Sequence, residues 1–104
     1  MKFFVVEKVR VVSQGETDKF AELATKDLKY KVQLEKQKKI VGGGPCLDIL
    51  ADYYILETKT IEEMGEIFFN SPTNFFVERE VHPLGSFEDS LQGMEEIQKP
   101  KKHV

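Results

Sequence analysis

The stretch Tyr53-Tyr54-Ile55-Leu56-Glu57-Thr58-Lys59-Thr60-Ile61-Glu62-Glu63-Met64-Gly65-Glu66-Ile67-Phe68 decides the fold. Its first six residues are rich in aromatic and β-branched side chains, which predicts a strand. Thr60 and Glu63 have the spacing of a capping box, in which Thr60 caps the amide of Glu63 and Glu63 reaches back. The apolar residues behind this box recur at helical spacing, so a short helix with one buried side follows the strand.

Upstream of this stretch, residues 2–12 combine Phe and Val with alternating charges and predict a first strand. Thr17 is a plausible N-cap for a long amphipathic helix that runs to about residue 38. Residues 40–41 open a short strand that we expect to stop in Gly42-Gly43-Gly44-Pro45. These glycines are expected to allow a tight bend, a bulge or a close backbone approach, because a phosphate loop would need them to open a helix.

Downstream, residues 70–74 predict a turn and residues 75–84 predict the last strand. The resulting order β-α-β-β-α-β is typical of the ferredoxin-like α+β fold, a four-stranded antiparallel sheet with two helices on one face. We expect this domain to cover residues 1–85. Residues 86–104 form a tail in which Ser86 and Asp89 could start one more helical turn, and its apolar residues Phe87, Leu91 and Met94 are expected to pack on a partner subunit.

The predicted strands are apolar on both sides. The first strand carries Phe3 and Val5 on one side and Phe4 and Val6 on the other. Two helices cover only one face, and an exposed apolar face of this size is unusual for a monomer. The pattern therefore predicts a homodimer, with two sheets face to face about a two-fold axis, from which a larger assembly could be built.

The composition excludes some classes of protein. The 104 residues carry a net charge of −3 and only two arginines, at positions 10 and 79, which argues against a nucleic-acid partner. The N-terminal apolar run is too short for a membrane span. The one cysteine, Cys46, allows no internal disulfide, which indicates a cytoplasmic protein. The two histidines are far apart, so no metal site or cofactor is predicted.

Several motifs resemble the dimeric α/β-barrel superfamily, and within it YciI-like and muconolactone isomerase-like proteins. They lie within residues 1–85 and are Lys39-Ile40-Val41-Gly42-Gly43-Gly44-Pro45, Tyr54-Ile55-Leu56-Glu57, Ile61-Glu62-Glu63, Ser71-Pro72 and Glu80-Val81-His82-Pro83-Leu84. The resemblance implies a barrel closed by two sheets across a dimer, with a small-molecule cleft beside it. YciI-like proteins pair a His on the first helix with an Asp before a later Pro. Those positions hold Asp27 and Ser71 here, so the resemblance implies no such proton shuttle.

Three residues are candidates for acid–base catalysis. Glu7 shares the apolar side of the first strand with Phe3 and Val5, where a desolvated carboxylate would have a raised pKa. The alternative is a Glu at the sheet edge that is solvated or paired with Lys or Arg79. His82 could titrate near neutral pH, although it lies at a strand end next to Pro83. Asp48 lies in the loop after the three glycines.

The candidate ligand-binding residues are aromatic. Tyr53 and Tyr54 lie on opposite sides of a strand, so one belongs to the core and the other could line a pocket, as Phe4 could. Cys46 is expected to be an inert, partly buried thiol. Two functions remain open: a small-molecule isomerase or lyase that moves a proton in a cleft, and a non-catalytic ligand-binding or oligomer-forming protein on the same scaffold.

Overall fold

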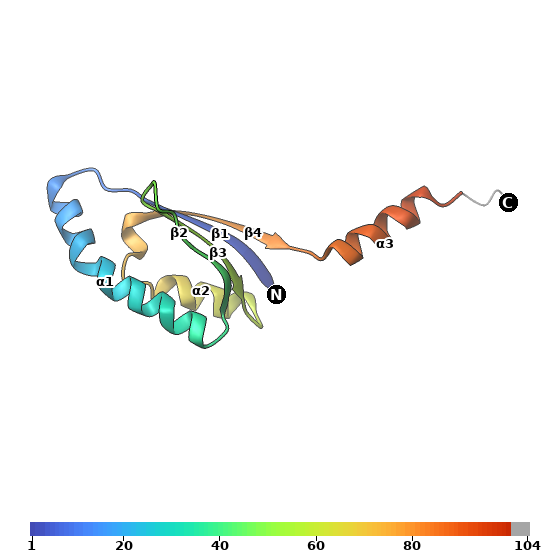
Figure 1. The fold of residues 1–104 in the computed structure, drawn as a ribbon, viewed down its shortest axis with the longest axis horizontal. Coiled ribbons are helices and arrows are strands. Elements are labelled where there is room, and N and C mark those ends of the chain that lie inside the picture. The colour runs from blue at the N-terminus through green and yellow to red at the C-terminus, as the bar shows by residue number, and fades with distance from the viewer. Residues whose placement is uncertain (101–104) are drawn as a thin grey trace.

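The computed structural model describes residues 1–100 and has the predicted ferredoxin-like α+β architecture (Figure 1). The sheet is antiparallel, with strand order β2-β3-β1-β4. Helices α1 and α2 lie on the same side of this sheet (Figure 1). The elements are β1 (Lys2–Val9), α1 (Gln14–Lys36), β2 (Ile40–Pro45), β3 (Ala51–Glu57), α2 (Ile61–Phe69), the 3₁₀ turn η1 (Asn74–Phe76), β4 (Val77–Leu84) and α3 (Phe87–Gln98).

The start of α1 lies earlier than the sequence prediction. Ser13, rather than Thr17, is the N-cap: its hydroxyl accepts a hydrogen bond from the amide of Glu16 at 3.1 Å. The Glu16 carboxylate accepts in turn from the amide of Val12 at 2.9 Å. These two bonds satisfy backbone donors at the helix start in the manner of a capping box. The Thr60–Glu63 box at the start of α2 was predicted and is confirmed.

The glycines lie inside β2 rather than after it. A bulge between Ile40 and Gly42 shifts the register with β3. Gly43 has φ of 91°, and a Cβ atom there would lie 2.1 Å from the carbonyl oxygen of Tyr53. Only glycine fits such a close approach in this left-handed conformation. The predicted bulge and close approach are therefore present, but they bend a continuing strand.

The last strand is shorter than predicted. Phe75 and Phe76 belong to η1, and β4 begins at Val77. The main core lies between the sheet and the two helices, where Val5 and Leu56 are fully buried. Other buried members of this core are Phe3, Leu34, Ile40, Tyr54 and Ile67. The sheet thus has a helix-covered face and an open face.

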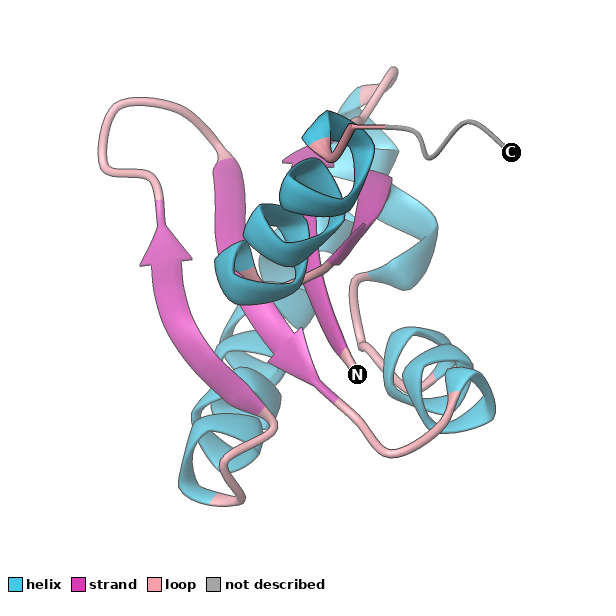
Figure 2. Cartoon of the chain, turned by 90° about the vertical axis from the view of Figure 1, so that its right-hand side faces the viewer, coloured by secondary structure: helices cyan, strands magenta, loops and turns pink. Residues whose placement is uncertain are grey.

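Helix α3 projects away from the rest of the chain, and in Figure 2 it points toward the viewer in front of the strands. It extends the molecule to 70 Å along its longest axis. It is longer than the single predicted turn, and Ser86 caps it as expected. The apolar stripe of Phe87, Leu91 and Met94 is exposed. Residues 101–104 of the predicted tail lie outside the described residues. Within residues 1–100, no helix combines the length and apolar character needed to cross a membrane.

Candidate functional site

A row of charged residues crosses the helix-covered face of the sheet at one level. Glu7 on β1 is paired in register with Asp52 on β3 and with Arg79 on β4. Side chains at paired positions of neighbouring strands lie on the same face, so the sheet itself brings these three together. Glu7 is 2% exposed, although it carries a carboxylate. A buried charge of this kind needs partners.

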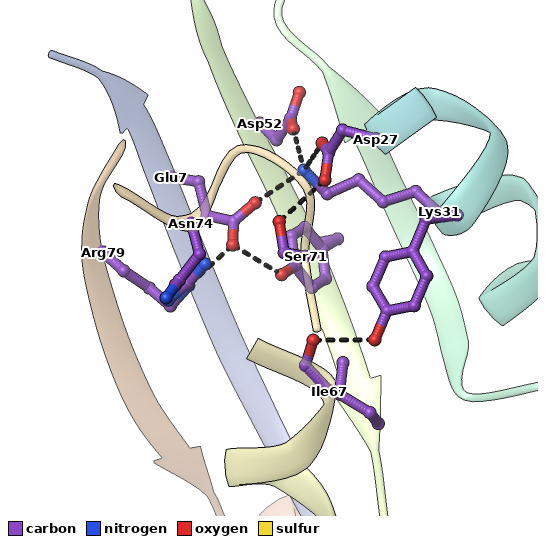
Figure 3. A network of polar contacts seen from close by, with 10 residues as sticks. Glu7, Asp27, Lys31, Asp52, Ile67, Ser71, Asn74 and Arg79 are labelled. Atoms are coloured by element: carbon purple, nitrogen blue, oxygen red, sulfur yellow. Dashed lines mark hydrogen bonds and ion pairs between the residues drawn. The ribbon is translucent and has the colours of Figure 1, made fainter. Parts of the chain in front are cut away.

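Lys31 of α1 supplies the central partner (Figure 3). Its ammonium nitrogen lies 2.7 Å from Oε1 of Glu7, 2.7 Å from Oδ2 of Asp27 and 2.6 Å from Oδ2 of Asp52. Asp27 precedes Lys31 by one helical turn, which places both on the same side of α1. One ammonium therefore joins the first helix to two strands.

Arg79 and Tyr54 hold the other oxygen of Glu7. The Nε of Arg79 donates to Oε2 of Glu7 at 2.6 Å, and the Tyr54 hydroxyl donates to the same oxygen at 3.0 Å. The Nη1 of Arg79 donates to Asn74 at 2.8 Å, and its guanidinium lies over the ring of Phe68. These contacts fix the orientation of the Glu7 carboxylate.

Asp27 also contacts the turn that follows α2. The hydroxyl of Ser71 donates to Oδ1 of Asp27 at 2.7 Å, and both side chains are buried (Figure 3). These are the two positions at which the YciI resemblance expects a His and an Asp. Asp27 and Ser71 are therefore in direct contact, but neither of them is a histidine.

Burial and the carboxylates set the protonation of the two donors. Burial disfavours the Lys31 ammonium, but Glu7 and the hydrogen bonds to Asp27 and Asp52 outweigh it, so the pKa of Lys31 is raised. Burial and the adjacent Glu7 raise the pKa of Tyr54. Both groups therefore keep their protons at neutral pH, and both act as hydrogen-bond donors.

Two cavities meet at the Lys31–Asp52 pair. Cavity 1, of about 200 Å³, contacts the first half of α1 and the loop before β3; its walls include Phe20, Ala24, Ile49, Leu50 and Val77, and Glu7 and Asp27 also line it. Cavity 2, of about 410 Å³, contacts the second half of α1 and strand β2; Val32, Glu35, Ile40, Gly43 and Tyr54 line it. Lys31, Asp52, Leu28 and Pro45 line both.

The charges of the cluster do not balance. Three carboxylates (Glu7, Asp27 and Asp52) face two cations, Lys31 and Arg79, which leaves one negative charge in excess. Asp52 is the most accessible of the three, with 23% of its side chain exposed. Only its Oδ2 is hydrogen-bonded within the part of the chain that the structure describes, so Oδ1 is available to a ligand. A carboxylate with a free oxygen in an apolar cavity is suited to accept a proton.

The predicted site residues fall into two groups. Glu7 and Tyr54 belong to the cluster. Tyr53, Phe4 and His82 lie on the open face, where the ring of Phe4 is 6.3 Å from Tyr53 and 6.5 Å from His82. His82 is exposed beside Glu80. Asp48 lies exposed in the loop before β3 and lines neither cavity, whereas the half-buried Cys46 lines cavity 1.

The sequence prediction missed Lys31 and Asp52 as site residues, and it named Arg79 only as a possible partner of Glu7, a pairing that the structure shows. Their register with Glu7 was the available signal for Asp52 and Arg79, since antiparallel neighbours at one level share a face. No local pattern distinguishes Lys31 from the other lysines of α1. Among residues 1–100, no group of His, Cys, Asp and Glu could hold a metal ion. Lys31 is the cation at the centre of the carboxylates instead.

No family model and no curated protein matches the chain. The solved structures that share its fold include two enzymes. Muconolactone isomerase has a TM-score of 0.73 and 16% sequence identity, and the match covers 83% of this chain and 90% of that one. The 5-chloro-2-hydroxyhydroquinone dehydrochlorinase TftG from Burkholderia phenoliruptrix AC1100, in complex with 2,5-dihydroxybenzoquinone, has a TM-score of 0.64 and 22% identity, and covers 86% and 98%. At these identities the likeness confirms the predicted resemblance at the level of the fold.

Proposed function

We propose that this protein is a small-molecule enzyme of the isomerase or lyase type that moves a proton in cavity 1. The observation that carries the proposal is the charge cluster: three carboxylates at the polar end of an apolar cavity, with only two cations to balance them. A cluster of interacting charged groups that lines a cavity is a recognised mark of catalytic sites. Two enzymes with this scaffold, an isomerase and a dehydrochlorinase, agree with the reaction class.

Asp52 is the proposed base. Its free Oδ1 would take a proton from a carbon or oxygen acid of the substrate, and the cluster would then hold two carboxylates and two cations. The neutral carboxyl would also be a weaker acceptor for Lys31, whose N–H would become available to the oxyanion that forms on the substrate. Return of the proton to another atom gives an isomerase, and departure of a leaving group from the neighbouring carbon gives a lyase.

Glu7 has a positioning role in this proposal. Its two oxygens are occupied by Lys31, Arg79 and Tyr54, so it orients the ammonium beside Asp52. Asp48 and His82 lie away from both cavities within one subunit and take no part in the proposed reaction.

Hydrogen–deuterium exchange tests the proposal. Small cyclic ketones, enones and lactones are incubated with the protein in D₂O, and loss of the proton next to the carbonyl is followed by NMR. We expect the wild type to accelerate exchange for part of this panel, and Asp52→Asn to lose about 10²- to 10⁴-fold of that acceleration. Asp48→Asn is the matched control, because it makes the same change in the exposed loop. Equal rates in wild type and Asp52→Asn, or no acceleration at all, would contradict the proposal.

The second candidate function is non-catalytic ligand binding. It is favoured by the Asp27–Ser71 pair, which occupies the positions of the expected proton shuttle without a histidine. In this case ligands would shift the NMR signals of cavity residues in the wild type and in Asp52→Asn, and neither protein would catalyse exchange. The two functions therefore differ in turnover and agree in binding.

We also propose a homodimer that buries the open face of the sheet. Phe4, Tyr53 and Ile55 are only half-buried there, and Leu84 is 43% exposed. A second sheet would remove this apolar surface from water. In analytical ultracentrifugation, we expect Phe4→Glu to raise the dissociation constant of the dimer strongly. Leu47→Glu, at a fully exposed loop position, is the control, and an equal effect of both changes would contradict this interface.

Residues 86–104 are proposed to act in the same assembly, with residues 1–85 as the folded domain. Phe87, Leu91 and Met94 of α3 are exposed, and an apolar stripe on a single helix needs a partner to be buried. Truncation after Gly85 should weaken dimerisation. An unchanged dissociation constant would contradict this role.

A further inference from the structure

We infer that the site takes an apolar molecule that offers a hydroxyl or ammonium donor to Asp52 and that is uncharged or positively charged, and that it excludes carboxylates of the same shape. This inference rests on the proposed function because it concerns the same cavities. It restricts the charge of the ligand, because a cleft in this fold could equally bind an anion. It assigns charge selection to Asp52 and Glu35.

The charges that line the two cavities are mostly negative. Glu7, Asp27 and Asp52 line cavity 1, and Glu35 and Asp52 line cavity 2. Among the residues that the structure describes, Lys31 is the one cation that lines these cavities. Arg79 holds the far oxygen of Glu7 and does not line either space. An entering anion would therefore meet four carboxylates and one ammonium.

That ammonium is already occupied. Three carboxylate oxygens lie within 2.7 Å of its nitrogen, and an ammonium has only three N–H donors. A ligand carboxylate could bind Lys31 only by displacing Asp27, Asp52 or Glu7. Displaced Asp27 or Asp52 would lose its cation and displaced Glu7 would keep only Arg79, and each of these losses is unfavourable in a site that is largely buried.

The free polar atom that the cluster offers to a ligand is an acceptor. Two buried atoms of the cluster lack an aligned hydrogen bond among residues 1–100: Oε1 of Glu7, which is ion-paired with Lys31 at 2.7 Å, and Nη2 of Arg79, a residue that lines neither cavity. Within residues 1–100, the hydrogen bond to Asp52 uses Oδ2, which leaves Oδ1 to a ligand. A partly buried acceptor such as Asp52 gains from a ligand that brings donors, and a carboxylate brings none.

The apolar walls of the two cavities determine the polarity and size of the rest of the ligand. Phe20, Ala24, Leu28, Ile49 and Leu50 surround cavity 1, and Leu28, Val32 and Ile40 surround cavity 2. Because the Lys31–Asp52 pair lies at the junction, the donor of a ligand in either cavity can reach Asp52. Cavity 1, at about 200 Å³, suits a single small ring, and a substituent could extend into cavity 2.

Three probes of similar shape test the inference: benzylamine, benzyl alcohol and benzoate, titrated into the ¹⁵N-labelled full-length protein and followed by NMR. We expect benzylamine and benzyl alcohol to shift the signals of cavity residues, with benzylamine binding at least about tenfold more tightly than benzoate, as one excess charge at short range in a partly buried site implies. Equal or tighter binding of benzoate would overturn the inference, as would the absence of binding by all three probes.

Two variants assign the selectivity to its residues. Asp52→Asn should lower the ratio of benzylamine to benzoate affinity by about tenfold, and Glu35→Gln, on the exposed edge of cavity 2, should lower it less. Asp48→Asn should leave the ratio unchanged. An unchanged ratio in both Asp52→Asn and Glu35→Gln would overturn the inference. Charge selection without proton exchange would contradict the proposed function alone, and exchange with preferred carboxylate binding would contradict this inference alone.

Discussion

Tyr53 and Tyr54 are neighbours on β3, yet they belong to two different regions of the molecule. Tyr54 faces the helices, is 4% exposed and donates a hydrogen bond to Glu7. Tyr53 faces the other way, is half-buried and lies near the ring of Phe4. Both faces of the sheet carry apolar and charged residues, so composition alone does not distinguish them. The difference arises from what covers each face.

On the helix-covered face, the charged side chains form a cluster because α1 crosses the sheet there. Glu7, Asp52 and Arg79 form one row across three strands, and Lys31 descends from the helix into that row. On the open face, Glu80 and His82 lie 3.6 Å apart with more than half of each side chain exposed. The same types of side chain are therefore coupled on one face and solvated on the other.

Removal of the Lys31 charge should have the largest effect on this contrast. Lys31→Met leaves three carboxylates with Arg79 as their only cation in the cluster, and we expect it to lower the free energy of unfolding by about 3–5 kcal/mol. Urea denaturation measures this loss. Lys29→Met is the matched control, since Lys29 is exposed on the same helix, and it should change stability by less than about 0.5 kcal/mol.

A similar, small cost for both substitutions would contradict the contrast between the two faces. It would mean that water enters the cluster and solvates its carboxylates in the folded state. The salt dependence of stability would separate the two cases, because added salt screens exposed ion pairs much more than buried ones.

The sequence predicts the fold well and the site only in part. Alternation of apolar residues and the capping box at Thr60 are local signals, and both were sufficient to place strands and helices. Glu7 was identified because its own strand shows which side it shares with Phe3 and Val5. Lys31 was not identified. Which lysine of α1 reaches the cluster depends on where the helix crosses the sheet, and no local sequence pattern contains that information.

The errors of prediction also have physical reasons. Gly42, Gly43 and Gly44 indicated the end of a strand, but the partner strand holds them in β2, and Gly43 is needed where the Tyr53 carbonyl comes close. Phe75 and Phe76 have high strand propensity, but η1 turns the chain there before β4. Tertiary contacts outweigh local propensity at the glycines, and the turn hydrogen bond from the Phe76 amide to the Thr73 carbonyl outweighs it at Phe75 and Phe76.

Alkaline pH should produce the second largest effect, through Tyr54. Its pKa in the folded protein is raised above the ordinary value of 10.0 by burial and by Glu7. Above pH 10.0 the unfolded state releases the Tyr54 proton while the folded state keeps it. The contribution of Tyr54 to stability is therefore fully present below pH 10.0 and is lost as the pH rises above it. Wild type should therefore lose about 1.4 kcal/mol per pH unit from this one group.

Tyr54→Phe and Tyr53→Phe sharpen this prediction as a matched pair on the two faces. Tyr54→Phe should lower stability by about 1–2 kcal/mol at neutral pH, because the Glu7 carboxylate loses a donor. Above pH 10.0 its curve should converge on that of wild type, whereas Tyr53→Phe, which leaves the donors of Glu7 in place, should cost less than Tyr54→Phe at neutral pH. Urea denaturation at several pH values measures both, and parallel curves for Tyr54→Phe would contradict the assignment.

Substitution of His82, on the open face, should have the smallest effect on the free energy of unfolding. Its side chain is 61% exposed and contacts the equally exposed Glu80, so His82→Gln should change the free energy of unfolding by less than about 0.5 kcal/mol. It should also leave proton exchange unchanged, because within one subunit His82 lies on the face opposite the cluster. The ring of Phe4 beside it belongs to the proposed dimer interface, so sedimentation is measured at the same protein concentration. If His82→Gln abolished exchange while the variant stayed folded and dimeric, the reacting groups would lie between the two sheets, and the open face would carry the chemistry.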